Sequence, residues 1–220
     1  MRADSKRTRA KILRAALALL NERGVGEVTV RHVARRARIS HGNLCYHFAN
    51  MGELIEALYH ELVAESDATS AGIVSRQPSI ELLYRLQSTT FDLMLKYRFL
   101  FLDFVAVFRA RPRLRHELRL LKQRRARQFA AFISWVDDHG LLGPERYAGE
   151  RELLFQKYDL MSDFWLSQAE IMRSGPLRDE KERYQRLTFS VLLPHLSKRG
   201  MIECRELGLL EPIASTDSGD

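Results

Sequence analysis

The sequence predicts an all-α fold, and three observations lead to that prediction. Long stretches of the 220 residues place apolar side chains at helical spacing, whereas the alternating pattern of strands is almost absent. Gly and Pro residues fall between these stretches, where helices end. Hydrophobic residues make up 45% of the chain, which is ordinary for a globular protein whose core needs no disulfide. We expect about nine helices.

Four helices are expected in the first third of the chain. The first covers about residues 5–23, and Gly24 suits the left-handed conformation common just beyond a helix. Two short helices follow, for which Thr29 and Ser40 are suitable N-caps because their oxygens can accept first-turn N–H groups. Asn50 and Glu53 resemble a capping box at the start of a fourth helix over about 51–67.

Five further helices are expected after a connection at residues 68–78. Breaks at Arg111-Pro112, Gly140 and Gly175-Pro176 separate them, and Pro194 should kink or shorten the last one, which should close at Gly200. The end of the chain is rich in small and polar residues and is expected to be disordered. The five helices are expected over about 80–96, 103–108, 113–139, 147–173 and 179–198.

The charge is concentrated in the first 50 residues. The whole chain carries a net charge of +7, but residues 1–50 hold 11 Lys and Arg against 3 Asp and Glu, whereas residues 51–220 hold 24 against 25. Such asymmetry is typical of a basic head that binds a polyanion. The alternative is that these residues only solvate exposed helix faces, as charged runs usually do.

The two short helices have the pattern of a helix-turn-helix. The first has an apolar face formed by Val30, Val33, Ala34 and Ala37, and the second can pack through Ile39, Leu44 and Phe48. The polar side chains between these positions are left on the outer surface. A short helix that presents small polar side chains, with Arg around it, suits the major groove of DNA.

Other functional classes have little support in the sequence. No apolar stretch approaches the ~20 residues of a membrane span, and no secretory leader is visible. Cys45 and Cys204 are far apart and have no paired cysteine nearby, which argues against a disulfide framework and fits the reducing cytoplasm. Catalytic and phosphate-binding motifs are missing, so an enzyme is disfavoured, and we expect no metal or cofactor.

The N-terminal quarter resembles a known family. In order and without gaps, it is similar to the DNA-binding domain of TetR-family transcriptional regulators, and the remaining helices are similar to that family's C-terminal domain in length and helicity only. The resemblance is carried by Ile12-Leu13-Arg14-Ala15-Ala16, Gly24, Thr29-Val30, Val33-Ala34, Ala37, Ile39-Ser40-His41-Gly42-Asn43-Leu44, Tyr46-His47-Phe48, Asn50 and Leu54.

Two positions depart from the family pattern. Cys45 stands where an aromatic residue is usual, and Met51, followed by the helix-weakening Gly52, stands where the family has a phosphate-contacting lysine. Both changes remove backbone contacts to DNA. Two groups of cations are expected to compensate, one around the short helices and one on a mobile N-terminal arm: Arg31, Arg35, Arg36 and Arg38, with Lys6, Arg7 and Arg9.

The resemblance implies roles for individual residues. Ser40, His41 and Asn43 would face base edges, which suits their chemistry because Asn can bond bidentately to adenine and His can donate to guanine. The alternative for Tyr46 is a place in the core, and for His47 a structural role. The expected phosphate contacts are Thr29, Arg31, Arg36, Arg38, Tyr46, His47 and Lys6.

The second half of the chain is rich in aromatic residues that could line a site for a small apolar effector. Ordinary core packing is the alternative for each of them. Asp103, Asp159 and Asp163 lie near apolar faces, where one could recognise a cationic ligand, although a solvated position is the alternative. The expected pocket residues are Phe91, Met94, Phe104, Phe108, Phe155, Tyr158 and Trp165.

The last two long helices are expected to pair with their copies across a two-fold axis. A dimer is also expected because one short helix reads few base pairs, whereas two heads about 34–36 Å apart reach successive major grooves. The expected interface includes Leu154, Met161, Leu187 and Val191, with Leu153, Leu160, Trp165 and Leu192 beside them.

The sequence therefore predicts a cytoplasmic, homodimeric repressor that binds a palindromic operator and is released by a small effector. The rival hypothesis is an all-helical interaction module whose basic head docks on acidic protein or membrane surfaces. The predicted division is a DNA-binding head over 1–50, a connecting helix over 51–67, a ligand-binding and dimerisation domain over 68–204, and a tail over 205–220.

Overall fold

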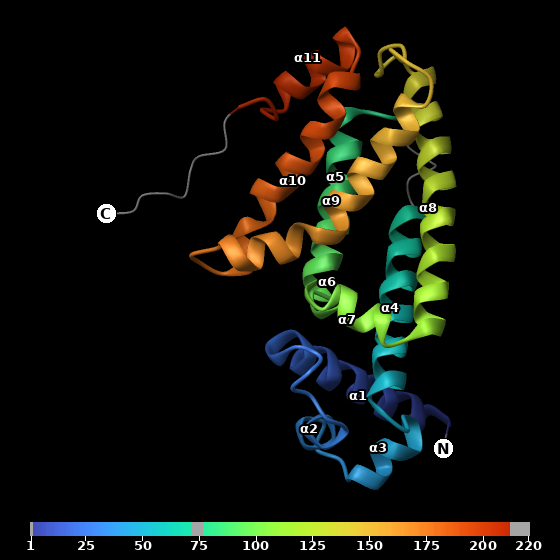
Figure 1. The fold of residues 1–220 in the computed structure, drawn as a ribbon, viewed down its shortest axis with the longest axis vertical. Helices are drawn as coiled ribbons and strands as arrows, with labels where there is room; N and C mark the ends of the chain where they lie inside the picture. Colours follow the sequence, from blue (N-terminus) through green and yellow to red (C-terminus); the bar gives the residue numbers. More distant parts are fainter. Residues whose placement is uncertain (1, 72–76, 212–220) are drawn as a thin grey trace. The chain divides into compact units, whose positions relative to one another are not determined.

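The computed structural model describes residues 2–71 and 77–211. Eleven α-helices and two 3₁₀ helices lie in these ranges, and an isolated bridge between Leu142 and Leu196 is their only strand-like pairing. The all-α prediction is confirmed (Figure 1). No helix in the described ranges is both long and apolar enough to span a membrane.

The chain divides into two compact units. The N-terminal unit contains Met1–Gly72 and Leu93–Leu120, and the C-terminal unit contains Ile73–Asp92 and Leu121–Asp220. Two helices, α5 (Ile80–Lys96) and α8 (Pro112–Asp138), therefore contribute residues to both. The four-part functional division expected from the sequence remains a prediction, and by packing residues 93–120 belong with the head.

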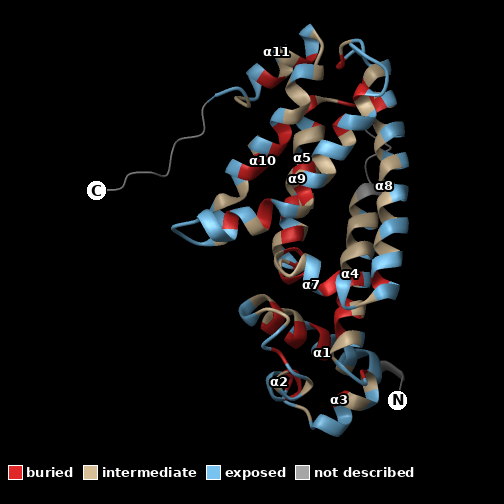
Figure 2. Cartoon of the chain, viewed as in Figure 1, coloured by how far each residue is buried: buried red, intermediate tan, exposed pale blue. Residues whose placement is uncertain are grey.

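Three-helix packing gives the head of the N-terminal unit its core. Helix α1 packs against α2 and α4, and α2 packs against α3. The apolar residues that face these contacts recur every three or four positions along each helix, and Figure 2 shows the buried residues in red. These helices are α1 (Arg2–Arg23), α2 (Val30–Arg36), α3 (His41–His47) and α4 (Met51–Ala71). The buried side chains include Ile12, Leu13, Ala16, Leu20, Val33, Ala34, Ala37, Leu44, Phe48, Leu54 and Leu58.

Helix α4 begins with the expected cap. The Asn50 side-chain oxygen accepts the N–H of Glu53 at 3.1 Å, and the Glu53 carboxylate accepts the N–H of Ala49 at 2.9 Å. A Cβ at Gly52 would lie 2.8 Å from the Asn50 oxygen. Gly52 therefore leaves room for the cap. The helix runs to Ala71, beyond the expected end at residue 67, so residues 68–71 of the connection expected over 68–78 are helical; residues 72–76 lie outside the described residues.

A corner of the chain after α5 is fastened to α1. The Asn21 amide donates to the Lys96 carbonyl at 2.8 Å and accepts the N–H of Phe99 at 3.1 Å. The Asp103 carboxylate accepts the N–H of Val25 at 2.8 Å. We call these three bonds the Asn21–Asp103 clamp. The helix expected over 103–108 is observed as α7 (Phe104–Arg109), and a short helix that was not expected, α6 (Phe99–Leu102), precedes it; the chain turns at Asp103 between the two.

Two apolar clusters are among the groups that pack the described helices of the C-terminal unit together. One centres on Ile133, Val136, Leu141, Leu142 and Leu154, and the other on Ile80, Phe189 and Cys204. Besides parts of α5 and α8, the unit contains α9 (Glu150–Met172), η1 (Leu177–Glu180), α10 (Lys181–Phe189), η2 (Ser190–His195) and α11 (Lys198–Glu206).

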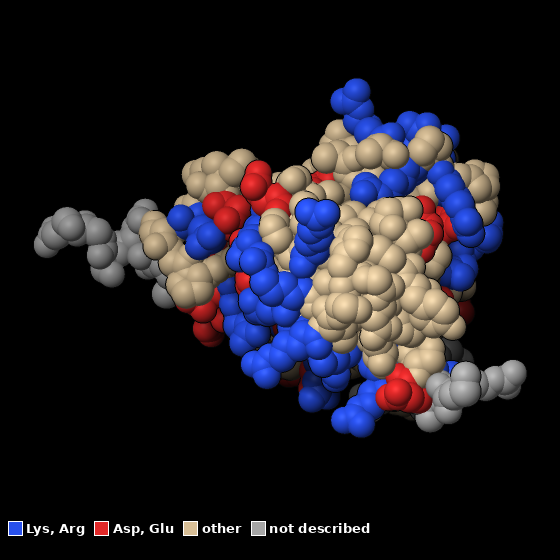
Figure 3. All heavy atoms as spheres, turned by 90° about the horizontal axis from the view of Figure 1, so that it is seen from below, with Lys and Arg blue, Asp and Glu red and all other residues tan. Residues whose placement is uncertain are grey.

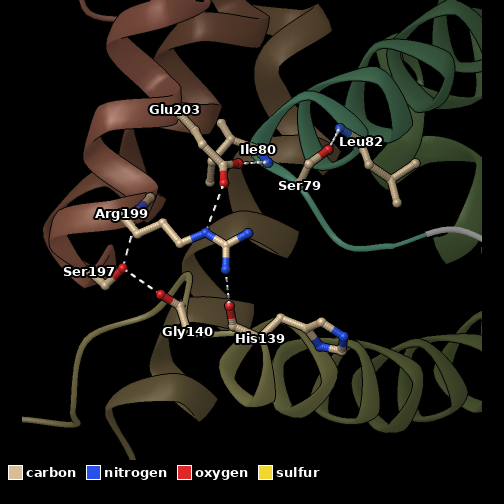
Figure 4. Close-up of polar contacts among 9 residues, drawn as sticks. Ser79, Ile80, Leu82, His139, Gly140, Ser197, Arg199 and Glu203 are labelled. Atoms are coloured by element: carbon tan, nitrogen blue, oxygen red, sulfur yellow. Dashed lines mark hydrogen bonds and ion pairs between the residues drawn. The ribbon is translucent and has the colours of Figure 1, made fainter.

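Polar contacts join three chain segments at one end of this unit (Figure 4). The Glu203 carboxylate accepts the N–H of Ile80 at 3.0 Å and pairs with Arg199 at 3.3 Å. Arg199 also donates to the His139 carbonyl at 3.0 Å, and Ser197 donates to the Gly140 carbonyl at 2.7 Å. These bonds satisfy carbonyls at the end of α8 and an N–H at the start of α5, which otherwise lack helical partners.

The last helix expected over 179–198 is shortened as Pro194 predicted: α10 ends at Phe189, and a separate helix, α11, begins at Lys198. Pro194 lies in the 3₁₀ turn η2, as its missing N–H favours, and Ser197 then caps a new helix by accepting the N–H of Gly200 at 3.1 Å. Gly200 lies inside this helix, α11, and does not end it. A glycine is needed there because a Cβ would lie 2.5 Å from the Leu141 carbonyl oxygen. Helix α11 continues to Glu206, within the expected tail, and residues 212–220 lie outside the described residues.

Candidate nucleic-acid interface

The two short helices are held at their N-termini by the side chains that the sequence indicated. The Thr29 hydroxyl accepts the N–H of His32 at 3.3 Å, and the His32 ring accepts the N–H of Thr29 at 3.4 Å, which completes a capping box with histidine in place of glutamate. The Ser40 hydroxyl accepts the N–H of Asn43 at 3.1 Å. Both predicted N-caps are confirmed.

The turn between α2 and α3 contains a strained residue. Arg38 has a φ of 50°, the only positive φ among the described non-glycine residues. Its N–H and that of Ile39 donate to the carbonyls of Arg35 and Ala34, which closes the end of α2. The left-handed conformation costs a residue with a Cβ about 1 kcal/mol, so the packing around the turn imposes this conformation on Arg38.

The first turn of α3 presents its polar side chains to solvent. Ser40, His41 and Asn43 are all exposed, while Leu44 and Phe48 on the opposite face are buried. Tyr46 is 82% exposed, which excludes the packed-core alternative for it. His47 is half-buried with its ring 5.2 Å from that of Tyr46. The residues expected to read bases therefore lie side by side on an open edge.

The arginines around this edge differ in how they are neutralised. Arg36 forms an ion pair with Glu22 of α1 at 2.7 Å, so its guanidinium is already shared. Arg31 and Arg38 are exposed, and neither has an ion-pair partner within the described ranges. Lys and Arg side chains gather on the face that Figure 3 shows. The free cations are those best able to approach phosphate.

The basic N-terminus belongs to a helix. Lys6, Arg7 and Arg9 lie on α1, so the expectation of a mobile arm is corrected. The Arg9 guanidinium lies 4.9 Å from the centroid of the Phe48 ring, the residue that ends α3. This cation–π contact holds a positive charge beside the recognition helix. The sequence contains the pair, but its 39-residue separation hides the contact.

The two cysteines have different surroundings. Cys45, on α3, is partly exposed, and its sulfur lies 3.6 Å from His41 Nε2. Cys204 is buried, and burial raises the pKa of its thiol to about 11. No cluster of three or more His, Cys, Asp and Glu suited to a metal occurs in the described ranges.

Two family models together span most of the chain. One, described as bacterial regulatory proteins of the tetR family, matches residues 12–58, and a second, described as bacterial transcriptional repressor, matches residues 58–202. The chain belongs to the TetR family of transcriptional regulators. The N-terminal match includes the capped helices and the exposed edge described above. The chain is thus a DNA-binding regulator rather than an enzyme.

The chain is similar to curated regulators over part of its length. It is 41% identical over 59 residues to the class A tetracycline repressor of transposon 1721 from Escherichia coli, a match that covers 27% of each chain. It is 30% identical over 90 residues to the probable regulator YttP of Bacillus subtilis, covering 40% of this chain and 42% of YttP. The chain thus spans less than half the length of these curated relatives.

Solved structures extend the likeness to the whole fold. A TetR-family regulator from Marinobacter aquaeolei VT8 has a TM-score of 0.82 at 24% identity, over 90% of this chain and 96% of that one. The ketosteroid regulator KstR2 of Mycobacterium tuberculosis has a TM-score of 0.64 at 22% identity, over 86% and 95%. At these identities the likeness shows the TetR fold alone.

The residues expected in an effector pocket come from both units. Phe91 and Trp165 stack with ring centroids 4.5 Å apart in the C-terminal unit, and Phe155 and Tyr158 lie there against Phe129. The remaining three, Met94, Phe104 and Phe108, belong to the N-terminal unit. Sequence reasoning missed Tyr184, whose ring centroid is 5.8 Å from that of Trp165.

The three aspartates suggested for a cationic ligand have partners in the chain. Asp159 and Asp163 both accept from Lys122, at 2.6 and 2.7 Å. Burial raises the pKa of Asp163, while the Lys122 charge opposes that rise. Asp103 is part of the Asn21–Asp103 clamp. These contacts account for each carboxylate without a ligand.

The expected interface residues are divided between surface and core. Leu154 is 2% exposed in its own core cluster, and Met161 and Val191 are half-buried, whereas Leu187 is 51% exposed. Burial within the subunit leaves Leu154 with little surface for a partner. The exposed apolar side chains of α9 are instead Leu153, Leu160, Phe164, Ile171 and Met172.

Proposed function

We propose that this TetR-family regulator is a homodimeric repressor that reads a palindromic operator and releases it when a small apolar effector binds the C-terminal unit. The exposed edge formed by Ser40, His41 and Asn43 carries the DNA-reading part of the proposal. Because the backbone N–H of Asn43 donates to the Ser40 hydroxyl, the first turn of α3 would already have its binding geometry in the free protein. The Asn43 amide would bond to adenine, and His41 would donate to guanine.

Phosphate contacts would hold this edge in register. The Thr29 hydroxyl accepts a bond within its capping box, so its own hydrogen is free for phosphate. The exposed hydroxyl of Tyr46 and the unpaired Arg31 and Arg38 would serve in the same way. Lys6 lies on α1 and is exposed. Arg36 would contact phosphate only by giving up or sharing its pair with Glu22.

A second copy of the chain is the proposed partner of the exposed face of α9. Leu153, Leu160, Phe164 and Ile171 are spaced by seven, four and seven residues, which places them within about 40° of one another around the helix. A row of this length is the pattern of a helix that packs on another helix. Leu187 extends the apolar surface onto α10, which packs against α9.

The effector is proposed to bind near the aromatic stack of Phe91, Trp165 and Tyr184. Two buried polar atoms lie within one helical turn of residues of this stack and have no hydrogen-bond partner among residues 2–71 and 77–211: the side-chain oxygen of Gln87, on α5, and the hydroxyl of Thr188, on α10. Buried polar atoms in native proteins nearly always have partners. A flat apolar molecule with a hydrogen-bonding group would supply the missing hydrogen-bond partners of these two atoms.

The Asn21–Asp103 clamp is the proposed route from effector to head. It ties α1 to the corner that follows α5, and α5 also carries Gln87 and Phe91. A shift of α5 on effector binding would therefore reach α1 through hydrogen bonds. The effector's leverage equals its differential affinity for the two arrangements, which is commonly about 1–3 kcal/mol.

The DNA proposal is tested by selection from random duplexes followed by fluorescence anisotropy at moderate salt. We expect one enriched palindrome and at least about 1,000-fold weaker binding to scrambled DNA. Absence of any enriched sequence would reject it. Binding to anionic vesicles or acidic peptides without sequence preference would instead support the interaction-module alternative.

Sedimentation equilibrium tests the dimer separately. The double variant Leu160→Glu/Phe164→Glu should be monomeric, because two charges would be buried in the proposed interface. The control Val105→Glu changes a side chain that is 54% exposed on α7 and should leave the mass of the assembly unchanged. A wild-type monomer at tens of micromolar would reject the homodimer.

A further inference from the structure

A second basic segment lies outside the head. Residues 109–127 contain nine Lys and Arg and a single acidic residue, a balance of +8, which equals that of residues 1–50. The segments on either side conceal it in the overall charge, because residues 51–108 hold 4 Lys and Arg against 8 Asp and Glu and residues 128–220 hold 11 against 16. The segment covers the end of α7 and the first half of α8.

Part of this charge is neutralised within the protein. Arg113 pairs with Glu117 at 3.2 Å, and Glu117 also lies 2.8 Å from the His60 ring. Lys122 pairs with two aspartates of α9. The Arg111 guanidinium donates to the Val107 carbonyl at 3.2 Å. These three cations have structural roles that account for them.

Three arginines of the N-terminal unit have no such role. Arg109, Arg115 and Arg119 are exposed, and none has an ion-pair or hydrogen-bond partner within residues 2–71 and 77–211. Arg115 and Arg119 are also four residues apart on α8, a spacing at which like charges repel. No ion pair or hydrogen bond within the described ranges offsets this repulsion.

The position of these arginines relates them to the DNA-reading head. The corner formed by α7 and α8 contacts α4 through the Tyr59 and Phe108 rings, 5.9 Å apart, and through His60 and Glu117. Tyr59 and His60 are eight and nine residues along α4 from Met51, or about 12–14 Å at 1.5 Å per residue. The corner that carries the arginines therefore contacts α4 just over two helical turns from the start of the connecting helix.

The connecting helix cannot supply this charge. Helix α4 contains five acidic residues and no Lys or Arg between Met51 and Ala71. Beyond the head, the exposed cations in the described part of the N-terminal unit are Lys96, which pairs with Glu65 at 2.6 Å, and those of α7 and α8, which can attract a phosphate backbone. Arginine is suited to that role because its planar guanidinium bonds two phosphate oxygens at once.

We propose that Arg109, Arg115 and Arg119 form a second phosphate-binding surface, which contacts DNA flanking the operator while the head reads its bases. Duplex DNA is the favoured partner because the same unit already brings it close, at high local concentration. The surface adds affinity and salt dependence without sequence preference.

The test compares two duplexes, the selected operator alone and the same operator with about 15 extra base pairs on each side. For the wild type we expect roughly threefold to tenfold tighter binding to the longer duplex and a salt slope steeper by about 1–2. The double variant Arg115→Gln/Arg119→Gln should lose both gains and bind the short duplex like the wild type.

A matched control removes the same charge elsewhere. Lys198→Gln/Arg205→Gln changes two exposed cations of α11 and should keep the full gain from the flanks. Circular dichroism and the unfolding midpoint establish that both variants fold. The proposal is overturned if the Arg115/Arg119 variant responds to flank length and salt as the wild type does, if both variants lose the gain equally, or if only binding to anionic vesicles changes.

Discussion

The head and the interior of the C-terminal unit differ in how far their polar side chains are exposed and hydrogen-bonded. In the head, Ser40 and Thr29 are exposed at helix N-termini and already bonded to backbone N–H groups. In the C-terminal unit, Gln87 and Thr188 are 4% and 1% exposed, yet each has a polar atom without a partner. The polar groups of these helix caps are thus already hydrogen-bonded before DNA binds, whereas the Gln87 side-chain oxygen and the Thr188 hydroxyl have no partner within the described residues.

The largest effect is expected on DNA binding by the exposed edge of α3. Asn43→Ala should relax specificity at one base position and cost about 1–3 kcal/mol on the preferred operator, because a bidentate contact is lost. Anisotropy with operators substituted one base pair at a time measures it. Equal loss on every sequence would show that Asn43 contacts the backbone or only supports the helix.

The opposite sign is expected in the interior. Thr188→Val keeps the shape of the side chain and removes a buried hydroxyl without a partner, so the free energy of unfolding should rise by about 1 kcal/mol. Urea denaturation at constant m-value measures the change. Thr90→Val is the matched control, because that hydroxyl donates to the Leu86 carbonyl at 3.0 Å and its loss should not stabilise the fold.

A smaller effect is expected at the turn between α2 and α3, where one substitution should raise stability and weaken DNA binding. Arg38→Gly should raise the free energy of unfolding by about 0.5 kcal/mol, since glycine adopts a φ of 50° without strain but loses more entropy. It should also reduce the salt slope of DNA binding by about 1. Arg36→Gln, which breaks the pair with Glu22, should change the slope less. The reverse ranking would contradict the assignment of Arg38 to phosphate.

The smallest effect concerns pH. Burial is the main reason why the pKa of His195 lies below its usual 6.5. The nearby Glu150 carboxylate raises this pKa, whereas the positive charges of Arg146, Lys157 and Arg151 lower it. The unfolded chain therefore binds a proton before the folded one, so stability should fall as pH drops below 6.5. His195→Gln should flatten this slope between pH 6.5 and 5, whereas His116→Gln, an exposed control, should not. Chemical denaturation at each pH provides the measurement.

Local patterns explain why the head was predictable. The caps at Thr29, Ser40 and Asn50 depend on residues three positions apart, and the apolar spacing of α2 sets its buried face. Each of these interactions is decided within one helical turn. The sequence therefore indicated both the fold of the head and the exposure of Asn43.

The C-terminal unit depends on contacts between distant residues, and the sequence was less informative there. Helix α9 has apolar residues on more than one face, so its pattern could not separate the buried Leu154 from the exposed Leu153. Gly200 indicated a helix end, but a close approach to the Leu141 carbonyl explains it. The stack of Trp165 on Phe91 joins residues 74 apart, which no local pattern can indicate.

The Asn21–Asp103 clamp also sets limits for protein engineering. Residues 21 and 25 are joined to residues 96, 99 and 103 by three hydrogen bonds, two of which involve main-chain N–H groups of the paired segments. A graft of residues 1–50 onto another sensor would leave the Asn21 amide and the Val25 N–H without partners. Chimeric sensors that respond as designed should therefore carry the corner at 96–103 together with the head, even though the two are far apart in sequence.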